Sequence, residues 1–306
     1  MKQPVTPPKP ILSISEMHHL LGLKKPKHPL VSVIRFEDMA STGTTVPRSI
    51  SYNFYHIALK KNYQGKIKYG QQYYDFDEGM MTFVAPQQVI TIDPDTPTSL
   101  EGFMLIIHPD FLQSYPLASK IKSYGFFSYA AYEALHLSEQ EEQAIMQLVA
   151  NIEREIDTNM DHFTQELIVS NIDLLLTYCN RFYNRQFITR KLANNDLLIK
   201  LETLLDVYFA SVELEKSGLP TVKYVADQLH VSASYLSDML RAHTGQSTQQ
   251  HIHNKLIEKA KTILSTTALS VSEVAYQLGF EYPQSFNKLF KSKTNQSPLE
   301  FRQSFQ

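Results

Sequence analysis

The sequence contains 306 residues, of which 43% are hydrophobic and 20% charged, and its formal net charge is −2 at pH 7. This composition is typical of a globular chain with two or three domains and a sizeable core. The single cysteine, Cys179, excludes an intrachain disulfide framework, and its apolar neighbours predict a buried, unreactive thiol.

The first stretch, residues 1–29, is rich in proline and lysine around one short amphipathic segment, ILSISEMHHLLGL. We expect an N-terminal arm that contains a single short helix. The start of the chain has no apolar core of the kind found in signal peptides, and the longest apolar runs are too short to span a bilayer. These features predict a cytoplasmic protein with no membrane partner.

Residues 30–110 show apolar positions with a period of two. Runs such as VSVIRF, SYNFYHIAL and FMLII are separated by Gly, Pro and Asp, which predicts the short antiparallel strands of a barrel or sandwich. Tyr52, Phe54 and His56 share one strand face. A small barrel with an aromatic interior can hold a ligand, so this region is a candidate ligand-binding domain.

Only two histidines, His56 and His108, lie in this strand region. A metal-dependent enzyme on such a barrel needs clustered histidines with a carboxylate on neighbouring strands, whereas the segment GQQYYDFDEGMMTF supplies tyrosines and acids. We therefore expect no catalytic residues, no metal site and no cofactor, and we expect both histidines to be packed or rim residues.

Residues 111–186 are predicted to be helical. Ser138 and Glu141 have the spacing of a capping box at the start of a helix. The apolar stripe of that helix consists of Ile145, Leu148, Val149, Ile152 and Ile156. A second helix is expected from about 161 to 185, with an apolar face of Leu167, Ile168, Leu174, Leu175, Tyr178 and Phe182. Both stripes fit packing against the strand domain, and both also fit pairing with a second copy of the chain.

Residues 187–195, FITRKLANN, are predicted to be a linker. Asp196 then opens an amphipathic helix, which we take as the first element of a C-terminal domain spanning 196–306. Its apolar side consists of Leu197, Leu198, Leu201, Leu204, Leu205, Tyr208 and Phe209.

Two segments of the C-terminal domain, 221–244 and 270–293, repeat one pattern of a short helix, a tight turn and a longer helix. In the second segment Ser270 and Glu273 can form a capping box, and Gly279 permits the turn. The apolar positions follow the three-and-four spacing of helix-turn-helix units, so each segment is predicted to be one such unit.

The connection between the two units, residues 248–265, is predicted to be one helix. At roughly 1.5 Å per residue it would be about 27 Å long. That length can hold two reading helices about one duplex turn apart, at about 34 Å, so that they enter successive major grooves.

The repeated units resemble the DNA-binding domain of the AraC/XylS family of bacterial transcription regulators. The matching residues are Ala226, the run YLSDML, Gly245 with Gln246 and Ser247, the run VAYQLGF, Ser285 with Phe286, Phe290 with Lys291, and Ser297 with Pro298. The order of strands, helices and repeated units also resembles this family, whose sensory domain is cupin-like. The resemblance implies a multidomain α+β protein, with an N-terminal cupin-like antiparallel β barrel plus helices and a C-terminal all-α tandem helix-turn-helix domain.

The same resemblance implies a sequence-specific transcription regulator, more commonly an activator than a repressor. Its expected partners are double-stranded promoter DNA, RNA polymerase, a small-molecule effector in the N-terminal domain and a second copy of the chain, paired through a helix of 111–186. Two alternatives concern the N-terminal half: a metal-dependent cupin enzyme fused to the DNA-binding domain, or a dimerisation domain without a ligand.

The second helix of the first unit can be capped by Ser232, and its side facing the core is expected to consist of Tyr235, Leu236, Met239 and Leu240. The core-facing side of the second helix in the second unit is expected to consist of Phe286, Leu289 and Phe290. The reading residues are expected on the opposite, outward sides of these helices. The base-reading candidates are Ser234, Ser237 and Asp238 in the first unit and Gln284, Ser285, Asn287 and Lys288 in the second. Gln and Asn can pair with adenine, and Lys with guanine or phosphate. Arg241 and Lys291 are expected to hold the DNA backbone. We expect Asp238 to pair with Arg241 three residues on, which would make the second unit the better reader.

The charge distribution agrees with this assignment. From Thr221 onward, nine Lys and Arg residues stand against six Asp and Glu residues, so this segment is basic and the rest of the chain is acidic. A basic segment suits the phosphate-binding end of a regulator.

Overall fold

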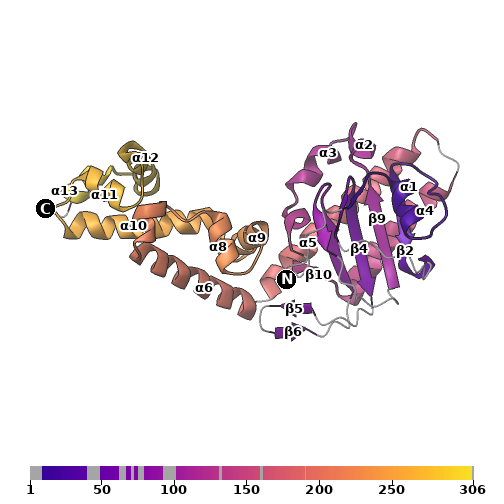
Figure 1. Cartoon of the computed structure of the whole chain (residues 1–306), viewed down its shortest axis with the longest axis horizontal. Coiled ribbons are helices and arrows are strands. Elements are labelled where there is room, and N and C mark those ends of the chain that lie inside the picture. The colour runs from indigo at the N-terminus through magenta and orange to yellow at the C-terminus, as the bar shows by residue number, and fades with distance from the viewer. Residues whose placement is uncertain are drawn as a thin grey trace, which may run out of the picture. The chain divides into compact units, whose positions relative to one another are not determined.

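The computed structural model describes residues 9–39, 49–61, 67–69, 72–74, 79–91, 101–130, 133–158, 161–189 and 191–304. The chain divides into two compact units, Met1–Gln186 and Phe187–Gln306. The first contains the sheets, the helix Ile14–Leu20 and the helices of 109–186, and the second consists of helices (Figure 1). This arrangement confirms the predicted α+β organisation.

A five-stranded sheet forms the centre of the N-terminal unit. Its order is β10-β7-β4-β9-β2, and all its neighbours are antiparallel. The strands are β2 (Val31–Arg35), β4 (Tyr55–Lys61), β7 (Met80–Val84), β9 (Glu101–Ile107) and β10 (Leu135–His136). The middle strands are buried on both faces, which explains why their sequences read as nearly continuous apolar runs.

A second, three-stranded sheet pairs β1 (Lys9–Ile11), β3 (Ser49–Tyr52) and β8 (Val89–Thr91) in the order β1-β3-β8. Buried side chains from both sheets form one apolar cluster, to which β3 contributes Ile50 and Tyr52 and the larger sheet contributes Ala58 and Ile106. The interior expected for a small barrel is therefore the space between these two sheets. A separate antiparallel pair consists of β5 (Ile67–Tyr69) and β6 (Gln72–Tyr74).

The described part of the predicted arm belongs to this core. β1 pairs in parallel with β3, and helix α1 (Ile14–Leu20) starts at Ser13, whose side chain accepts a hydrogen bond from Glu16 N at 3.1 Å. Ile11, Ile14 and Met17 are all at most 3% exposed within the apolar cluster. Residues 9–20 thus stabilise the sandwich rather than extend from it.

Helices lie around the larger sheet (Figure 1). They are α2 (Pro109–Leu112), α3 (Leu117–Lys120), α4 (Glu139–Asp157) and α5 (Thr164–Thr189), with short 3-10 turns at Phe36–Asp38, Ile121–Ser123 and Gly125–Ser128. The predicted capping box of Ser138 and Glu141 and the buried stripe of α4 are confirmed. Cys179 of α5 is fully buried, its Sγ lies 3.9 Å from Met81 Sδ, and burial raises the pKa of its thiol.

One part of the α5 prediction is wrong. Leu167 and Leu174 are each 46% exposed, although both were expected on the buried face. The buried stripe instead follows the spacing of Ile168, Ile172 and Leu175, and so its centre lies one residue further along the chain. A helix that is apolar on more than one side does not reveal by periodicity alone which side is covered.

The C-terminal unit contains α6 (Lys191–Ala210), α7 (Glu213–Ser217), α8 (Val222–Gln228), α9 (Ala233–Thr244), α10 (Thr248–Thr266), α11 (Val271–Gln277), α12 (Pro283–Thr294) and α13 (Pro298–Gln303). Both predicted helix-turn-helix units are present, as α8–α9 and α11–α12, and they lie toward opposite ends of α10 (Figure 1). Among the described residues, no helix combines the length and the apolarity needed to cross a membrane.

The segment expected to be a linker is helical on both sides of Arg190, because α5 continues to Thr189 and α6 begins at Lys191. It contains no Pro or Gly that would end a helix. Phe187 is buried with its ring 5.3 Å from that of Tyr235, and Asn195 Oδ1 lies 2.7 Å from His243 Nε2. These residues therefore pack onto the first helix-turn-helix unit instead of forming a free connection.

Candidate nucleic-acid interface

The two helix-turn-helix units share their backbone turns. His230 and Gly279 end the first helix of each unit with positive φ angles of 56° and 78°, and Gly245 and Asn295 end the second helices at 75° and 60°. Left-handed residues at these positions stop a helix and redirect the chain. The same turns recur at matching places, so the sequence repeat corresponds to a structural repeat.

Helix α9 is fixed at its start and along its inner face. Ser232 caps it by accepting a hydrogen bond from Tyr235 N at 3.2 Å, as predicted. The predicted inner face is confirmed, because Tyr235, Leu236, Met239 and Leu240 are at most 3% exposed.

Helix α12 is held in a similar way. The capping box of Ser270 and Glu273 starts the preceding helix α11, and Pro283 occupies the first turn of α12. Phe286 and Phe290 are fully buried. Leu289, which we expected to face inward with them, is only half-buried.

The polar side chains of α9 are engaged within the chain. Ser237 Oγ lies 3.0 Å from Thr248 Oγ1 at the start of α10, and Arg241 Nη1 donates to Asp238 Oδ1 at 3.0 Å. The expected pair of Asp238 and Arg241 is thus formed. Ser234 is half-buried near the start of the helix. Two of the three base-reading candidates of the first unit therefore already have polar partners.

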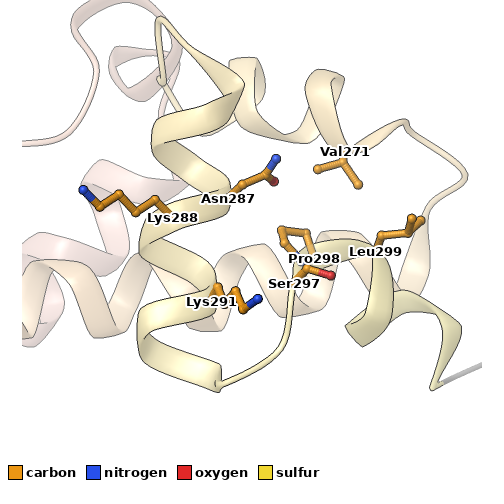
Figure 2. Close-up of a pocket in the computed structure, with 7 residues that line it drawn as sticks. All are labelled: Val271, Asn287, Lys288, Lys291, Ser297, Pro298 and Leu299. Carbon is orange, nitrogen blue, oxygen red and sulfur yellow. The ribbon is translucent and has the colours of Figure 1, made fainter.

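The polar side chains of α12 are more exposed to solvent than those of α9. Gln284, Ser285, Asn287 and Lys288 are all exposed. Within the described part of the chain, Lys288 and Lys291 form no ion pair, so their charges face solvent. Figure 2 shows Asn287 on the side of α12 nearest Val271, with Lys288 directed to another side.

A shallow groove adjoins this helix. Its lining residues are Val271, Asn287, Lys288, Lys291, Ser297, Pro298 and Leu299, which come from α11, α12 and the start of α13 (Figure 2). The lining combines apolar side chains with the cationic Lys288 and Lys291, and Leu299 is 55% exposed. We did not predict Val271 or Leu299 as site residues. The Ser297 and Glu300 capping box could have indicated α13, which brings Leu299 to the groove.

The two histidines of the strand region differ in their surroundings. His108 caps α2, because its Nδ1 accepts a hydrogen bond from Asp110 N at 3.3 Å. His56 lies on β4, is 8% exposed, and its Nδ1 has no hydrogen-bond partner among the residues that the structure describes. Its ring centroid is 5.7 Å from that of Tyr52. Within the described ranges, no three His, Cys, Asp or Glu side chains are grouped to hold a metal.

Burial lowers the pKa of His56 to about 3, and the neighbouring charge of Lys60 also lowers it. In the unfolded chain the pKa is about 6.5. Between these values the unfolded state binds a proton that the folded state does not, and so stability falls as the pH drops below about 6.5. A buried imidazole without a partner is unusual in a structural core, and it marks the interior of the sandwich as a place where a polar group is unsatisfied.

We predict that His56→Gln removes this pH dependence. At about 1.4 kcal/mol per pH unit, His56 alone should lower the free energy of unfolding by about 2 kcal/mol between pH 7.5 and pH 5. The measurement is chemical unfolding of both proteins across this range. Burial also lowers the pKa of His28, but that contribution is common to both proteins and cancels in their difference. Parallel pH profiles for the two proteins would contradict the prediction.

Family models match both units of the chain. A model described as "Helix-turn-helix domain" matches residues 225–304, and one described as "AraC-like ligand binding domain" matches residues 32–176. The chain belongs to the AraC family.

Among curated proteins, this AraC-family chain is 30% identical over 162 residues to the HTH-type transcriptional activator RhaS of Enterobacter sp. (strain 638). The match covers 53% of this chain and 54% of RhaS. The match therefore spans about half the length of that relative. It is 24% identical over 260 residues to the uncharacterized HTH-type transcriptional regulator YfiF of Bacillus subtilis, covering 82% of this chain and 77% of YfiF.

Among solved structures, the C-terminal domain of the response regulator yesN from Fusobacterium nucleatum is 27% identical to this AraC-family chain. The match has a TM-score of 0.31 and covers 35% of this chain and 98% of that domain.

Proposed function

We propose that this AraC-family protein is a sequence-specific DNA-binding regulator that reads two successive major grooves with α9 and α12. The observation that carries the proposal is the set of exposed Gln284, Asn287 and Lys288 on the second helix of a helix-turn-helix unit. Amide side chains suit adenine, and Lys suits guanine or phosphate. Arg241 and Lys291 would contact phosphates, which sets the register of the protein on the duplex.

Selection of bound sequences from genomic DNA, followed by footprinting, tests this proposal. We expect enriched sites with two protected segments whose centres lie about one helical turn apart. Binding without any enriched sequence, or protection of only one segment, would contradict it. The genes beside the enriched sites would in turn indicate the signal to which the protein responds.

We infer that the protein activates transcription by contacting RNA polymerase at promoters. The relative named a transcriptional activator supports this direction. Transcription in vitro from an enriched promoter should rise when the protein is added, whereas a fall would indicate a repressor. A DNA-bound regulator of this kind would work in the cytoplasm, where the bacterial chromosome lies.

We further propose that the N-terminal unit binds a small-molecule effector between its two sheets. The ligand-binding description of the matching family model supports this, as does His56 in the apolar interior, whose Nδ1 lacks a partner within the described ranges. Mass spectrometry of molecules that co-purify with the protein, together with thermal-shift screening, tests the proposal. If no molecule co-purifies and none raises the melting temperature, a dimerisation domain without a ligand becomes the better interpretation.

We also propose that the protein forms a homodimer through α5. Leu167 and Leu174 of α5 are each 46% exposed, and Phe163, directly before the helix, is 55% exposed. Large apolar side chains that recur along one helix are typical of a pairing surface. We predict a dimer mass by light scattering that shifts toward the monomer in Leu167→Glu/Leu174→Glu. A monomer mass for the unmodified protein at all concentrations would rule out the dimer.

A further inference from the structure

The segment that precedes the first helix-turn-helix unit contacts that unit directly. The ring centroid of Tyr208, near the end of α6, lies 5.3 Å from that of Tyr224 in α8. The same helix also contacts the connecting helix α10, because Lys255 Nζ lies 2.5 Å from Asp206 Oδ1 and Lys259 Nζ donates to the carbonyl of Phe209. The end of α6 is therefore fixed against both elements.

The segment also contacts the second unit. A Cβ atom at Gly279, in the turn between α11 and α12, would lie 2.4 Å from Leu214 O and 2.7 Å from Gly218 Cα. Only a glycine permits this approach, so the backbone of α7 and its C-terminal residue Gly218 rest directly on the turn that positions α12.

Tyr208 joins these two contacts. Its hydroxyl donates to Gly218 O at 2.9 Å while its ring packs on Tyr224, and the residue is only 7% exposed. A continuous path of contacts thus runs from the first unit through Tyr208 and Gly218 to Gly279 of the second. Burial raises the pKa of Tyr208, and so its hydroxyl keeps the proton that it donates.

We propose that Tyr208 is a positioning residue that sets the placement of the two reading helices, α9 and α12, relative to each other. The inference rests on the proposed function, because it concerns how two DNA-reading units act together. Helix α10 is one connection between the units, and a connection along a single axis resists twisting of one unit relative to the other less than two separate connections do. A second connection away from its axis restricts that twist, which lowers the ordering cost when both units bind one duplex.

The test measures affinity of the full chain for three kinds of duplex: the two-box site recovered by genomic selection, the same site with either box scrambled, and the site with one or two base pairs inserted between the boxes. Tyr208→Phe keeps the ring and removes the donor. We expect roughly two- to tenfold weaker binding to the two-box duplex, as for loss of one buried hydrogen bond. Affinity for one-box duplexes should not change, and the penalty for inserted base pairs should shrink.

Tyr224→Ala removes the other end of the path and should give the same pattern; Tyr224 is 38% exposed, so the fold should tolerate the change. Tyr115→Phe is the matched control, since its hydroxyl makes no hydrogen bond within the described residues, and it should leave every affinity unchanged. Equal losses on one-box and two-box duplexes, or unchanged spacing dependence in both variants, would overturn the inference. Failure of the unmodified chain to bind the selected duplex would instead overturn the proposed function.

Discussion

Alanine at Gln284, Asn287 and Lys288 together is expected to remove most of the discrimination between the selected site and unrelated DNA. These side chains are exposed on α12, and a good bidentate base contact contributes about 1–3 kcal/mol of discrimination. The triple variant should therefore lose specific affinity by on the order of 100-fold or more. Each single variant should lose less, and each should relax specificity at a different base pair. Gel-shift titration at fixed salt concentration measures both effects.

Two controls separate base reading from general attraction to DNA. Lys291→Ala should weaken binding to specific and unrelated duplexes alike and reduce the slope of log K against log salt by about one. Ser234→Ala/Ser237→Ala in the first unit should have a smaller effect than the triple variant, because the Ser237 hydroxyl already contacts Thr248. If the triple variant bound the selected site as tightly as the unmodified protein, the assignment of α12 as the main reading helix would be wrong.

Gly279→Ala should strongly destabilise the second helix-turn-helix unit. The residue has a φ of 78°, which costs a side chain about 1–2 kcal/mol, and its Cβ would overlap Leu214 O and Gly218 Cα. Overpacking adds about 1–3 kcal/mol, so we expect a total loss of about 2–5 kcal/mol. Native-state hydrogen exchange of the amides in α11 and α12 measures the local loss, which a single unfolding transition of a two-unit chain would blur.

Gly245→Ala is the matched control for this prediction. Gly245 has almost the same φ, 75°, but a Cβ there would meet nothing within 4 Å. Gly245→Ala should lower the stability by only about 1–2 kcal/mol, because only the left-handed backbone conformation disfavours the side chain. His230, at the equivalent turn of the first unit, already carries a side chain at a φ of 56°. Equal destabilisation by the two alanine substitutions would show that the contact with α7 adds nothing.

Local features of this chain could be predicted well from its sequence. The capping boxes at Ser138 and Ser270 and the inner face of α9 depend on residues within one or two helical turns, and all three are as expected. The exposed polar face of α12 follows in the same way, because it is what remains after the buried aromatics are removed. Sequence patterns within one or two helical turns therefore predict these features without knowledge of the tertiary fold.

Features that depend on distant partners could not be predicted. Nothing near Ser237 in the sequence indicates that its hydroxyl would meet Thr248, and nothing near Leu174 indicates which side of α5 the sheet would cover. Nothing near Asn195, in the segment predicted to be a linker, indicates that its side chain would contact His243, 48 positions away. His56 was likewise taken for an ordinary packed residue, because an unsatisfied ring nitrogen has no signature in sequence.

The ion pair between Asp238 and Arg241 has a consequence for how the two units respond to ionic strength. A guanidinium that is paired with a carboxylate displaces fewer condensed cations when it approaches the duplex, whereas Lys288 and Lys291 form no ion pair within the described residues. The affinity of the first unit for DNA should therefore change little as the salt concentration rises, while the affinity of the second unit should fall steeply. The share of the DNA affinity that each unit contributes therefore depends on the salt concentration. The unit that contributes most in dilute buffer contributes a smaller share in concentrated buffer.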